Sequence, residues 1–599
     1  MKKLKSWISN YKLMVKPYWK YGKIYCISFA IWNAVYQPFN TMFQVFFLQV
    51  TINRLSNGDP FKMLLFTIVF FIGIKVIVSL ISESLCYLYF FVKEEEIKIK
   101  INLEVYKKLS KLDYACFDDS DFFDEYTVSY VQYANKAGDA YRFLFLDALS
   151  LLTSVGVLSI YLLEASPLIV VITLISVLIN LFTGKMRNRV NKEREDKLAF
   201  FARLSDYFSR MLSNRENAMD RKCTNIYHII INKLINTGKS IIHIRKTFAK
   251  KDNKVAAVDT IVNGGVDFGI RIILCWIINI GQVGVGSFVA MLSASSSLSW
   301  KLQLISRSYE NMDKVSIHGN RIRRFNERPM MIESFVDNEN ISDNKNQAAF
   351  DVEFKNVNFS YPNSGFSLKN INFKIKKGEK IAIVGENGGG KTTLTKLLLR
   401  LYDPNNGVIL INGKPLKEYE LNTYRNNVGV AFQETPIYAI PLCENISVYN
   451  AINNTELVTL FNDLSMNNIL EKNNATFDSI LTKEFDSNGI MLSSGEKQIL
   501  SIARIYTKTF NLLILDEPSS ALDPIMEEKI SRLILDKAQK STTILISHRL
   551  STVVDADNIF VIHNGEIQES GRHRELMKNK GLYYEMFETQ SKKYKDRIL

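Results

Sequence analysis

The sequence of 599 residues predicts an α-helical transmembrane domain of six long helices, followed by an α/β domain. Six long apolar runs occupy the first half, and each reaches the roughly 17 to 25 residues that a helix needs to cross a bilayer. In the second half, short segments rich in Val, Ile and Phe alternate with helical patterns, which indicates an α/β domain. We expect the transmembrane domain at 1–310, a linker at 311–348 and the α/β domain at 349–599.

The apolar runs are the expected membrane helices, and a cluster of lysines precedes the first of them. The positive-inside rule places this cluster in the cytosol, and an even number of crossings returns the C-terminal half to the same side. We therefore expect a multi-pass protein of the cell membrane, in contact with lipid, with both termini in the cytosol. The runs lie at about Ile24–Val50, Leu64–Phe91, Phe143–Leu163, Leu168–Gly184, Val255–Ile280 and Val283–Ile305.

The composition limits the chemistry that the chain could perform. The formal net charge is +14, from 75 basic and 61 acidic residues. Because much of the positive charge serves to orient the membrane helices, we expect no nucleic-acid partner. The six cysteines lack the spacing of metal sites or disulfides, so we expect reduced thiols without zinc or redox chemistry.

Two inward connections, about Val92–Arg142 and Lys185–Lys254, are too charged for the membrane but carry helical periodicity. We expect the membrane helices to continue through them far into the cytosol before the chain turns back. The expected turning points are Asp118–Tyr126 and Ser213–Lys222, where polar residues that favour helix starts interrupt the pattern.

The segment IAIVGENGGGKTTL reads as a buried strand, a glycine-rich loop and the start of a helix, and it matches G-x-x-x-x-G-K-[ST]. Glycines allow backbone N–H groups to close on phosphate oxygens at a helix N-terminus. Lys391 is expected to reach the β and γ phosphates, and Thr392 to supply an oxygen to Mg²⁺. The expected phosphate-binding residues are Gly385, Asn387, Gly388, Gly389, Gly390, Lys391, Thr392 and Thr393.

The segment NLLILDEP is an apolar strand that ends in Asp516 and Glu517. A carboxylate at a strand tip is able to hold Mg²⁺, and its neighbour is able to act as a base on water. Adjacent acids after a strand are otherwise solvated turn residues, but the glycine-rich loop earlier in the chain favours the functional interpretation. We expect Asp516 to be a metal ligand and Glu517 to be a general base.

These motifs, in this order, resemble the nucleotide-binding domain of ATP-binding cassette (ABC) transporters, and Leu492–Glu496 (LSSGE) resembles the signature LSGGQ of that family. The membrane half resembles that of six-helix exporters whose intracellular helices end in coupling helices. The stretch FDDSDFFDEY is similar to the first coupling helix of lantibiotic exporters. The resemblance covers nearly the whole chain and implies a bacterial half-transporter that hydrolyses ATP with Mg²⁺ to drive export.

The resemblance also implies roles for individual residues. Tyr361 would stack on adenine, Gln433 would be the Q-loop glutamine, and His548 would hold the γ-phosphate. The implied catalytic residues are Gln433, Glu517 and His548, and the implied metal ligands are Thr392, Gln433 and Asp516. Further ATP contacts are implied for Tyr361, for Ser493 and Gly495 of the signature, and for Asp523 of the D-loop.

Three residues depart from the family pattern. Ser494 and Glu496 replace Gly and Gln of the signature, and Gly389 stands where Ala or Ser is more usual. Because Ser is small and uncharged and a helix N-terminus favours a carboxylate, we expect a competent signature.

One chain carries one membrane half and one cassette, so two chains are needed to enclose ATP. A homodimer is expected because the set of catalytic residues is complete, and a heterodimer is the alternative.

The segment before the first run leaves no room for a leader-cleaving peptidase domain, so we expect another protein to remove any leader peptide.

The cargo is expected to be a peptide, as the resemblance to lantibiotic exporters implies. Ionisable residues within apolar runs are costly and are candidate cargo contacts. Asp267 and Arg271 lie one helical turn apart, so a purely structural ion pair is the alternative interpretation of these two. A lipid flippase, a multidrug exporter, and an ATP-gated channel or regulator stay open as other functions. The candidate residues of a substrate passage are Glu83, Asp147, Asp267 and Arg271.

Overall fold

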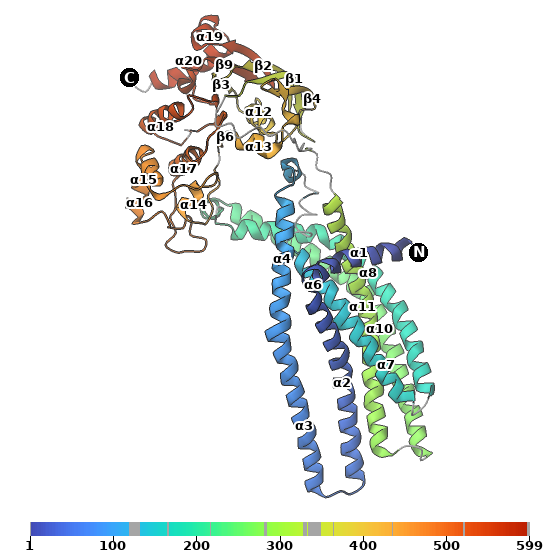
Figure 1. The fold of residues 1–599 in the computed structure, drawn as a ribbon. Helices are drawn as coiled ribbons and strands as arrows, with labels where there is room; N and C mark the ends of the chain where they lie inside the picture. The colour runs from blue at the N-terminus through green and yellow to red at the C-terminus, as the bar shows by residue number, and fades with distance from the viewer. Residues whose placement is uncertain are drawn as a thin grey trace. The chain divides into compact units, whose positions relative to one another are not determined.

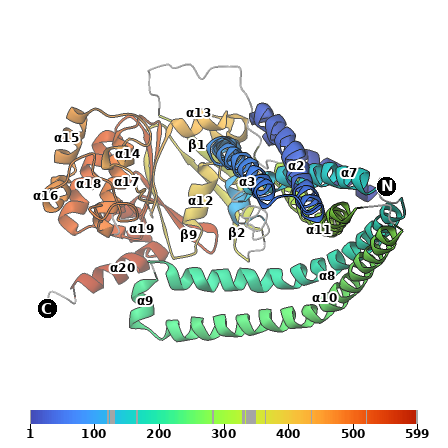
Figure 2. The ribbon, with the colours of Figure 1, turned by 90° about the horizontal axis from the view of Figure 1, so that it is seen from below.

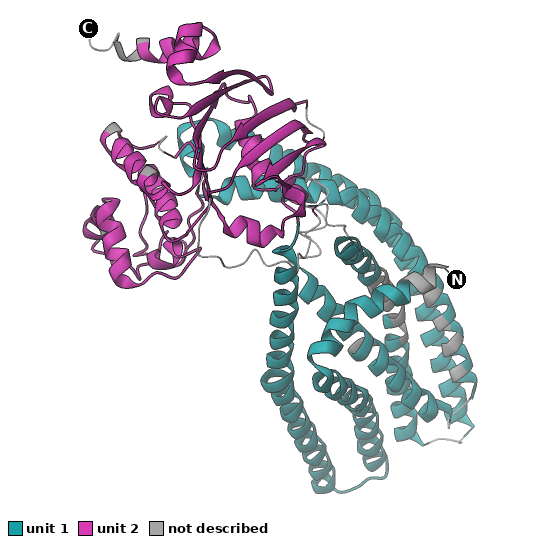
Figure 3. Ribbon diagram, turned by 45° about the horizontal axis from the view of Figure 1, so that its top comes forward, with its two compact units in different colours: residues 1–112, 119–329 teal, residues 113–118, 330–599 magenta. Residues whose placement is uncertain are grey.

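The computed structural model divides into two compact units (Figures 1 and 3). Unit 1 comprises residues 1–112 and 119–329, and unit 2 comprises residues 113–118 and 330–599. The expected boundaries at 310 and 348 stay a prediction, and a helix continues through the start of that segment as far as Glu327. The structure describes residues 2–118, 122, 132–163, 167–215, 217–280, 284–327, 332, 349–362, 365–433, 435–518 and 521–595.

Unit 1 is helical throughout its described residues, and each predicted apolar run falls on one long helical segment to within a few residues. The helices extend well past the apolar runs, which confirms the predicted fold of this half. A helix α1 (Lys2–Tyr21) precedes them. The long segments are α2 (Lys23–Ser56), α3–η1–α4 (Phe61–Leu109), α6–η4–α7 (Tyr133–Leu163), α8 (Pro167–Ser213), α10 (Ile226–Asn279) and α11 (Val285–Glu327).

Hydropathy explains why these segments leave apolar side chains exposed. In the described residues, Phe61–Leu109, Tyr133–Leu163 and Ile226–Asn279 are long and apolar enough to cross a membrane by length and composition. Only 6% of the most apolar 18-residue window of Phe61–Leu109 is buried within the chain. A helix that is apolar on all sides and unburied fits a lipid environment.

Helices α8 and α10 lie side by side and are joined by the short helix α9 (Ala218–Cys223), at the second predicted turning point (Figure 2). Arg187 contacts Asp259 at 2.6 Å and Arg194 contacts Asp252 at 2.8 Å, so ion pairs between the helices hold their charged extensions together. At the first turning point most residues, 119–121 and 123–126, lie outside the described part of the chain.

Unit 2 is an α/β fold, as predicted. A six-stranded sheet has the order β10-β9-β3-β8-β7-β6, in which every pairing except β9–β10 is parallel. Its strands are β3 (Lys380–Gly385), β6 (Val428–Ala431), β7 (Leu512–Asp516), β8 (Thr542–Ile546), β9 (Asn558–His563) and β10 (Glu566–Gly571). An antiparallel sheet has the order β2-β1-β4-β5, formed by β2 (Ser367–Ile375), β1 (Val352–Ser360), β4 (Asn406–Ile411) and β5 (Lys414–Pro415).

The helices of unit 2 include α12 (Lys391–Leu398), α17 (Ser494–Tyr506) and α18 (Pro524–Lys537), whose N-terminal ends carry predicted ATP-site residues. The segment Tyr114–Asp118 (η2) also belongs to this unit. The remaining elements are η5 (Leu416–Glu418), α13 (Leu421–Asn426), α14 (Leu442–Ile446), α15 (Asn454–Asp463), α16 (Asn467–Asn473), η6 (Leu550–Val553), α19 (His573–Asn579) and α20 (Leu582–Lys595).

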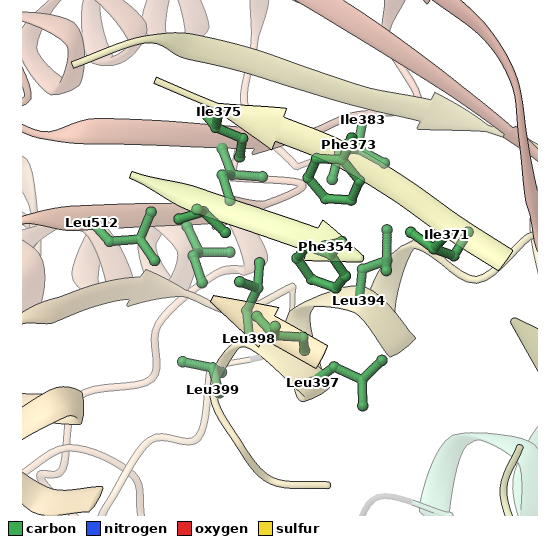
Figure 4. Close-up of a cluster of buried hydrophobic side chains, with 14 of the residues drawn as sticks. Phe354, Ile371, Phe373, Ile375, Ile383, Leu394, Leu397, Leu398, Leu399 and Leu512 are labelled. Carbon is green, nitrogen blue, oxygen red and sulfur yellow. The ribbon is translucent and has the colours of Figure 1, made fainter. Parts of the chain in front are cut away.

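The main core of unit 2 lies between the two sheets and α12 (Figure 4). Phe354 and Phe373 stack with ring centroids 4.5 Å apart, and Leu394 and Leu397 bring α12 against them. This packing fixes the N-terminus of α12 at the carboxyl end of β3, the edge of a parallel sheet where ligands usually bind.

Candidate functional site

The glycine-rich loop connects β3 to α12 as predicted from its sequence. Lys391, the first residue of α12, is buried, and its Nζ donates to the carbonyl oxygens of Gly385 and Glu386, both at 2.9 Å. Burial lowers the pKa of Lys391, and the carboxylates of Glu517 and Asp516 partly oppose that shift. The ammonium group is thus held over the loop, next to the free N–H groups of a helix N-terminus, which is an arrangement that favours phosphate.

Gly390 has no substitute in this loop. Its φ is +113°, and a Cβ would lie 2.5 Å from the side chain of Leu368 and 3.0 Å from that of Phe366. The loop therefore reaches α12 only with glycine at this position.

Two carboxylates lie at the carboxyl end of β7. Asp516 ends the strand and is buried, and burial raises its pKa to about 6, with a further contribution from the adjacent Glu517. A bound cation would favour the ionised form of Asp516, so this residue fits a Mg²⁺ ligand. The described part of the chain has no cluster of three or more His, Cys, Asp or Glu side chains able to hold a metal. A cation here would take its other ligands from hydroxyl, amide and phosphate oxygens, which suits Mg²⁺.

Glu517 lies between the two other residues implied in catalysis. Its Oε1 is 2.7 Å from Nε2 of His548, and its Oε2 accepts a hydrogen bond from Nε2 of Gln433 at 3.0 Å. Burial and the charge of Lys391 lower the pKa of His548, and Glu517 opposes this effect. The three residues come from strand ends and loops far apart in the sequence.

These groups line one cavity of about 630 Å³, a size typical of small-molecule sites. The hydroxyl of Tyr361, the residue implied to stack on adenine, lies 3.2 Å from Oγ1 of Thr393. Phe366 also lines the cavity; sequence reasoning missed it because it belongs to no motif. The lining residues are Tyr361, Phe366, Asn387, Gly388, Gly390, Lys391, Thr392, Thr393, Gln433, Glu517 and His548.

A second feature missed by sequence reasoning is the surroundings of Lys396 on α12. Its Nζ lies over three tyrosine rings, 5.2 Å from the centroid of Tyr114, 5.3 Å from Tyr361 and 5.8 Å from Tyr402. Cation–π contacts at such distances are attractive. The ammonium group thus connects the cavity residue Tyr361 with Tyr114 of η2.

The signature residues lie outside this cavity. Ser493 is the N-cap of α17: its Oγ accepts from the backbone N of Glu496 at 3.3 Å, and the Glu496 carboxylate accepts from the backbone N of Ser493 at 2.7 Å. Asp523 similarly caps α18 by accepting from the backbone N of Ile525 and Met526. Neither residue lines the cavity of its own chain.

The candidate passage residues are dispersed among the helices of unit 1. In α10, Nη2 of Arg271 lies 2.8 Å from Oδ2 of Asp267, so the two form an ion pair on one helix face. The other carboxylate oxygen of Asp267, Oδ1, is buried without a hydrogen-bond partner among the described residues. Glu83 is an exposed residue of α3, and the side chain of Asp147 lies outside what the structure describes.

Comparison with known proteins identifies the family. The model of the ABC transporter family matches residues 368–520. The subtilin transport ATP-binding protein SpaT of Bacillus subtilis is 31% identical over 511 residues, which cover 82% of this chain and 80% of SpaT. The chain belongs to the ABC transporter family. This ABC exporter is a membrane protein that binds ATP and couples its hydrolysis to transport.

Two further proteins resemble the ABC exporter over nearly its full length. The nisin transport ATP-binding protein NisT of Lactococcus lactis is 25% identical over 588 residues, or 96% of this chain and 94% of NisT. A solved structure of a bacterial Atm1-family ABC exporter with ATP bound superposes with a TM-score of 0.76 at 20% identity, covering 94% of this chain and 98% of the other. The second likeness confirms the predicted fold class.

Proposed function

We propose that this ABC exporter moves an amphipathic peptide from the cytosol across a bacterial cell membrane, as a homodimer. The observation that carries the ATP-driven part is the cavity in which Glu517 contacts both Gln433 and His548. The peptide cargo is supported by likeness to proteins named for subtilin and nisin transport, because that likeness covers the membrane half as well as the cassette.

The predicted site residues would divide the tasks of ATP binding and hydrolysis among them. Glu517 would accept the proton of the attacking water. Gln433 and His548 contact its carboxylate and would hold it in place, and His548 would also hold the γ-phosphate. Lys391 and the N–H groups of the loop would bind the phosphates, and Tyr361 would stack on the base. Thr392, Gln433 and Asp516 would hold Mg²⁺, which supplies positive charge opposite the phosphates when it is bound.

The dimer is supported by the position of the signature. Ser493 and Gly495 do not line the cavity that holds the other ATP-binding residues of the same chain. In a homodimer each signature would instead close on the γ-phosphate bound to the second copy. ATP would then favour the closed state because it binds that state more tightly than the open one.

A cargo passage near Asp267 and Arg271 is supported by the chemistry of the pair. Arg271 is about half exposed within the chain, with 55% of its side chain accessible, and the buried Oδ1 of Asp267 has no hydrogen-bond partner in the described residues. A peptide that carries both charge and apolar groups could contact such a pair in an apolar helix.

The deciding experiment compares three ligands with the purified protein in proteoliposomes. We expect a cationic amphipathic peptide to raise the ATPase rate several-fold and to accumulate in the vesicle lumen, in the orientation where the cassettes face outward. The Glu517→Gln protein is the control and should do neither. Stimulation by phospholipid or by a small hydrophobic cation, without stimulation by the peptide, would replace this proposal with a flippase or a multidrug exporter. Conductance without accumulation would indicate a channel.

A further inference from the structure

A side chain of the helix that follows the signature contacts the loop that carries the catalytic carboxylate. Gln498 lies in the second turn of α17 and is buried, with 9% of its surface exposed. Its Oε1 accepts a hydrogen bond from the backbone N of Ala521 at 2.8 Å, and its Nε2 donates to the carbonyl oxygen of Glu517 at 3.4 Å. One amide group thus contacts the backbone on both sides of residues 518–520.

Gly495, three residues earlier, faces the same loop. A Cβ at this position would lie 3.2 Å from the carbonyl oxygen of Ala521 and 3.6 Å from the side chain of Leu522. Residues three apart occupy one face of a helix, so the start of α17 packs against this loop at two positions about one helical turn apart. Gly495, the one glycine that the signature of this chain keeps, permits the close approach, and Gln498 makes the hydrogen bonds to the loop.

The backbone of Glu517 requires such support. Its φ is +51°, in the left-handed region that a residue with a side chain rarely adopts. Such a conformation persists only where surrounding contacts impose it. Its N–H donates to the carbonyl oxygen of Ile546 at 2.9 Å, and its own carbonyl oxygen accepts from Gln498. Gln498 therefore holds one of the two backbone groups that fix the direction of the Glu517 side chain.

We propose that Gln498 is a positioning residue for Glu517 and that it joins the signature to the catalytic carboxylate of the same cassette. The inference rests on the proposed dimer, in which the signature contacts ATP held by the second copy. Closure of α17 on the partner's ATP would then be transmitted through Gln498 to Glu517, which acts on the ATP of its own chain. This link through Gln498 would couple the two ATP sites of the dimer. It would act alongside any direct contacts between the two cassettes.

The test uses the full-length dimer with three substitutions at two positions. Gln498→Met keeps the length of the side chain and removes both hydrogen bonds, whereas Gln498→Glu keeps the acceptor for Ala521 and removes the donor to Glu517. Ser501→Ala is the matched control, since Ser501 is also buried on α17 and, among the described contacts, makes no hydrogen bond to this loop. ATPase rate against ATP concentration, ATP affinity and melting temperature are measured for each.

We expect Gln498→Met to lower kcat by roughly tenfold to a hundredfold, because small misplacements of a catalytic group have effects of this size. KM for ATP should stay within about twofold, and the Hill coefficient for ATP should fall towards one. Gln498→Glu should have a similar effect on kcat. Ser501→Ala should leave kcat, KM and the Hill coefficient at their wild-type values.

Two results would overturn the inference. One is a Gln498→Met protein whose kcat and Hill coefficient match those of the wild type. The other is a fall of kcat that parallels the melting temperature and is equal in Ser501→Ala, which would give Gln498 a structural role alone. If Gln498→Met does not fold, the same criteria apply to Gln498→Glu. Failure of the proposed dimer would be recognised separately, because the wild-type protein would then be monomeric or would hydrolyse ATP without cooperativity.

Discussion

At the scale of single residues, hydrolysis is expected to depend most on Glu517. Its carboxylate contacts both Gln433 and His548, so Glu517→Gln should retain the contacts that place it but lose the base. We expect ATP binding to persist while the turnover rate falls by about 10² to 10⁴. Glu528→Gln is the control, because Glu528 is exposed and pairs only with Arg532 among the described contacts. A Glu517→Gln rate within about twofold of the wild type would refute the role as base.

The signature allows a second prediction at this scale. Ser493 and Glu496 form a capping box, a motif in which Gln serves as well as Glu. Restoring the usual signature by Ser494→Gly with Glu496→Gln should therefore change the ATPase rate only a few-fold. Ser493→Arg should abolish it, whereas Ser493→Thr keeps the cap and should resemble the wild type. A gain above about a hundredfold on restoration would show a degenerate signature and favour a heterodimer.

Motifs predicted most residues of the cavity, but not their supports. Glu517, Gln433 and His548 were recognisable because each belongs to a short pattern of fixed residue types. Gln498 was not, since its contact with Glu517 depends on how α17 packs against the loop that follows β7. The space around Gly389 was equally hidden: a Cβ there would lie 3.1 Å from the carbonyl oxygen of Glu386, so this loop is tight for the more usual Ala.

At the scale of elements, α10 carries a test of the cargo passage. Asp267→Asn with Arg271→Gln should change the stimulation of ATPase by peptide and leave the basal rate nearly intact, because the pair lies outside the ATP site. The matched control exchanges the charges, Asp267→Arg with Arg271→Asp, which preserves an ion pair of opposite direction. Stimulation should stay altered in the exchanged protein. A parallel loss of basal rate and melting temperature that the exchange repairs would make the pair structural.

Hydropathy predicted where the long helices of unit 1 lie, and periodicity predicted that they extend further. Neither could predict how the extensions pair. Arg187 and Asp259 are 72 residues apart in the sequence, and they meet because α8 and α10 run alongside each other after α9 reverses the chain. The cluster around Lys396 was hidden for the same reason, since Tyr114 joins it from a segment that precedes the cassette by more than two hundred residues.

At the scale of the whole molecule, the distribution of the predicted ATP-binding residues supports the proposal that two chains act together. The cavity contains residues to bind and hydrolyse the nucleotide, whereas Ser493 lies outside it and caps an exposed helix N-terminus. A helix N-terminus with an exposed hydroxyl suits a phosphate brought by another molecule. In the proposed homodimer a second copy of the chain would supply that phosphate without the need for a new site, because both partners would contribute the same pair of surfaces.

Mixed dimers test this arrangement directly. The wild-type chain and the Glu517→Gln chain, each with a different affinity tag, are produced together and purified over both tags in turn. A homodimer should yield abundant mixed dimers, and their ATPase rate should fall well below half that of wild-type dimers, because a site that cannot turn over keeps the shared closed state populated. A rate of about half would mean that the two sites work independently. Recovery of no mixed dimer, together with low activity of the wild-type chain alone, would show that the functional partner is a different subunit.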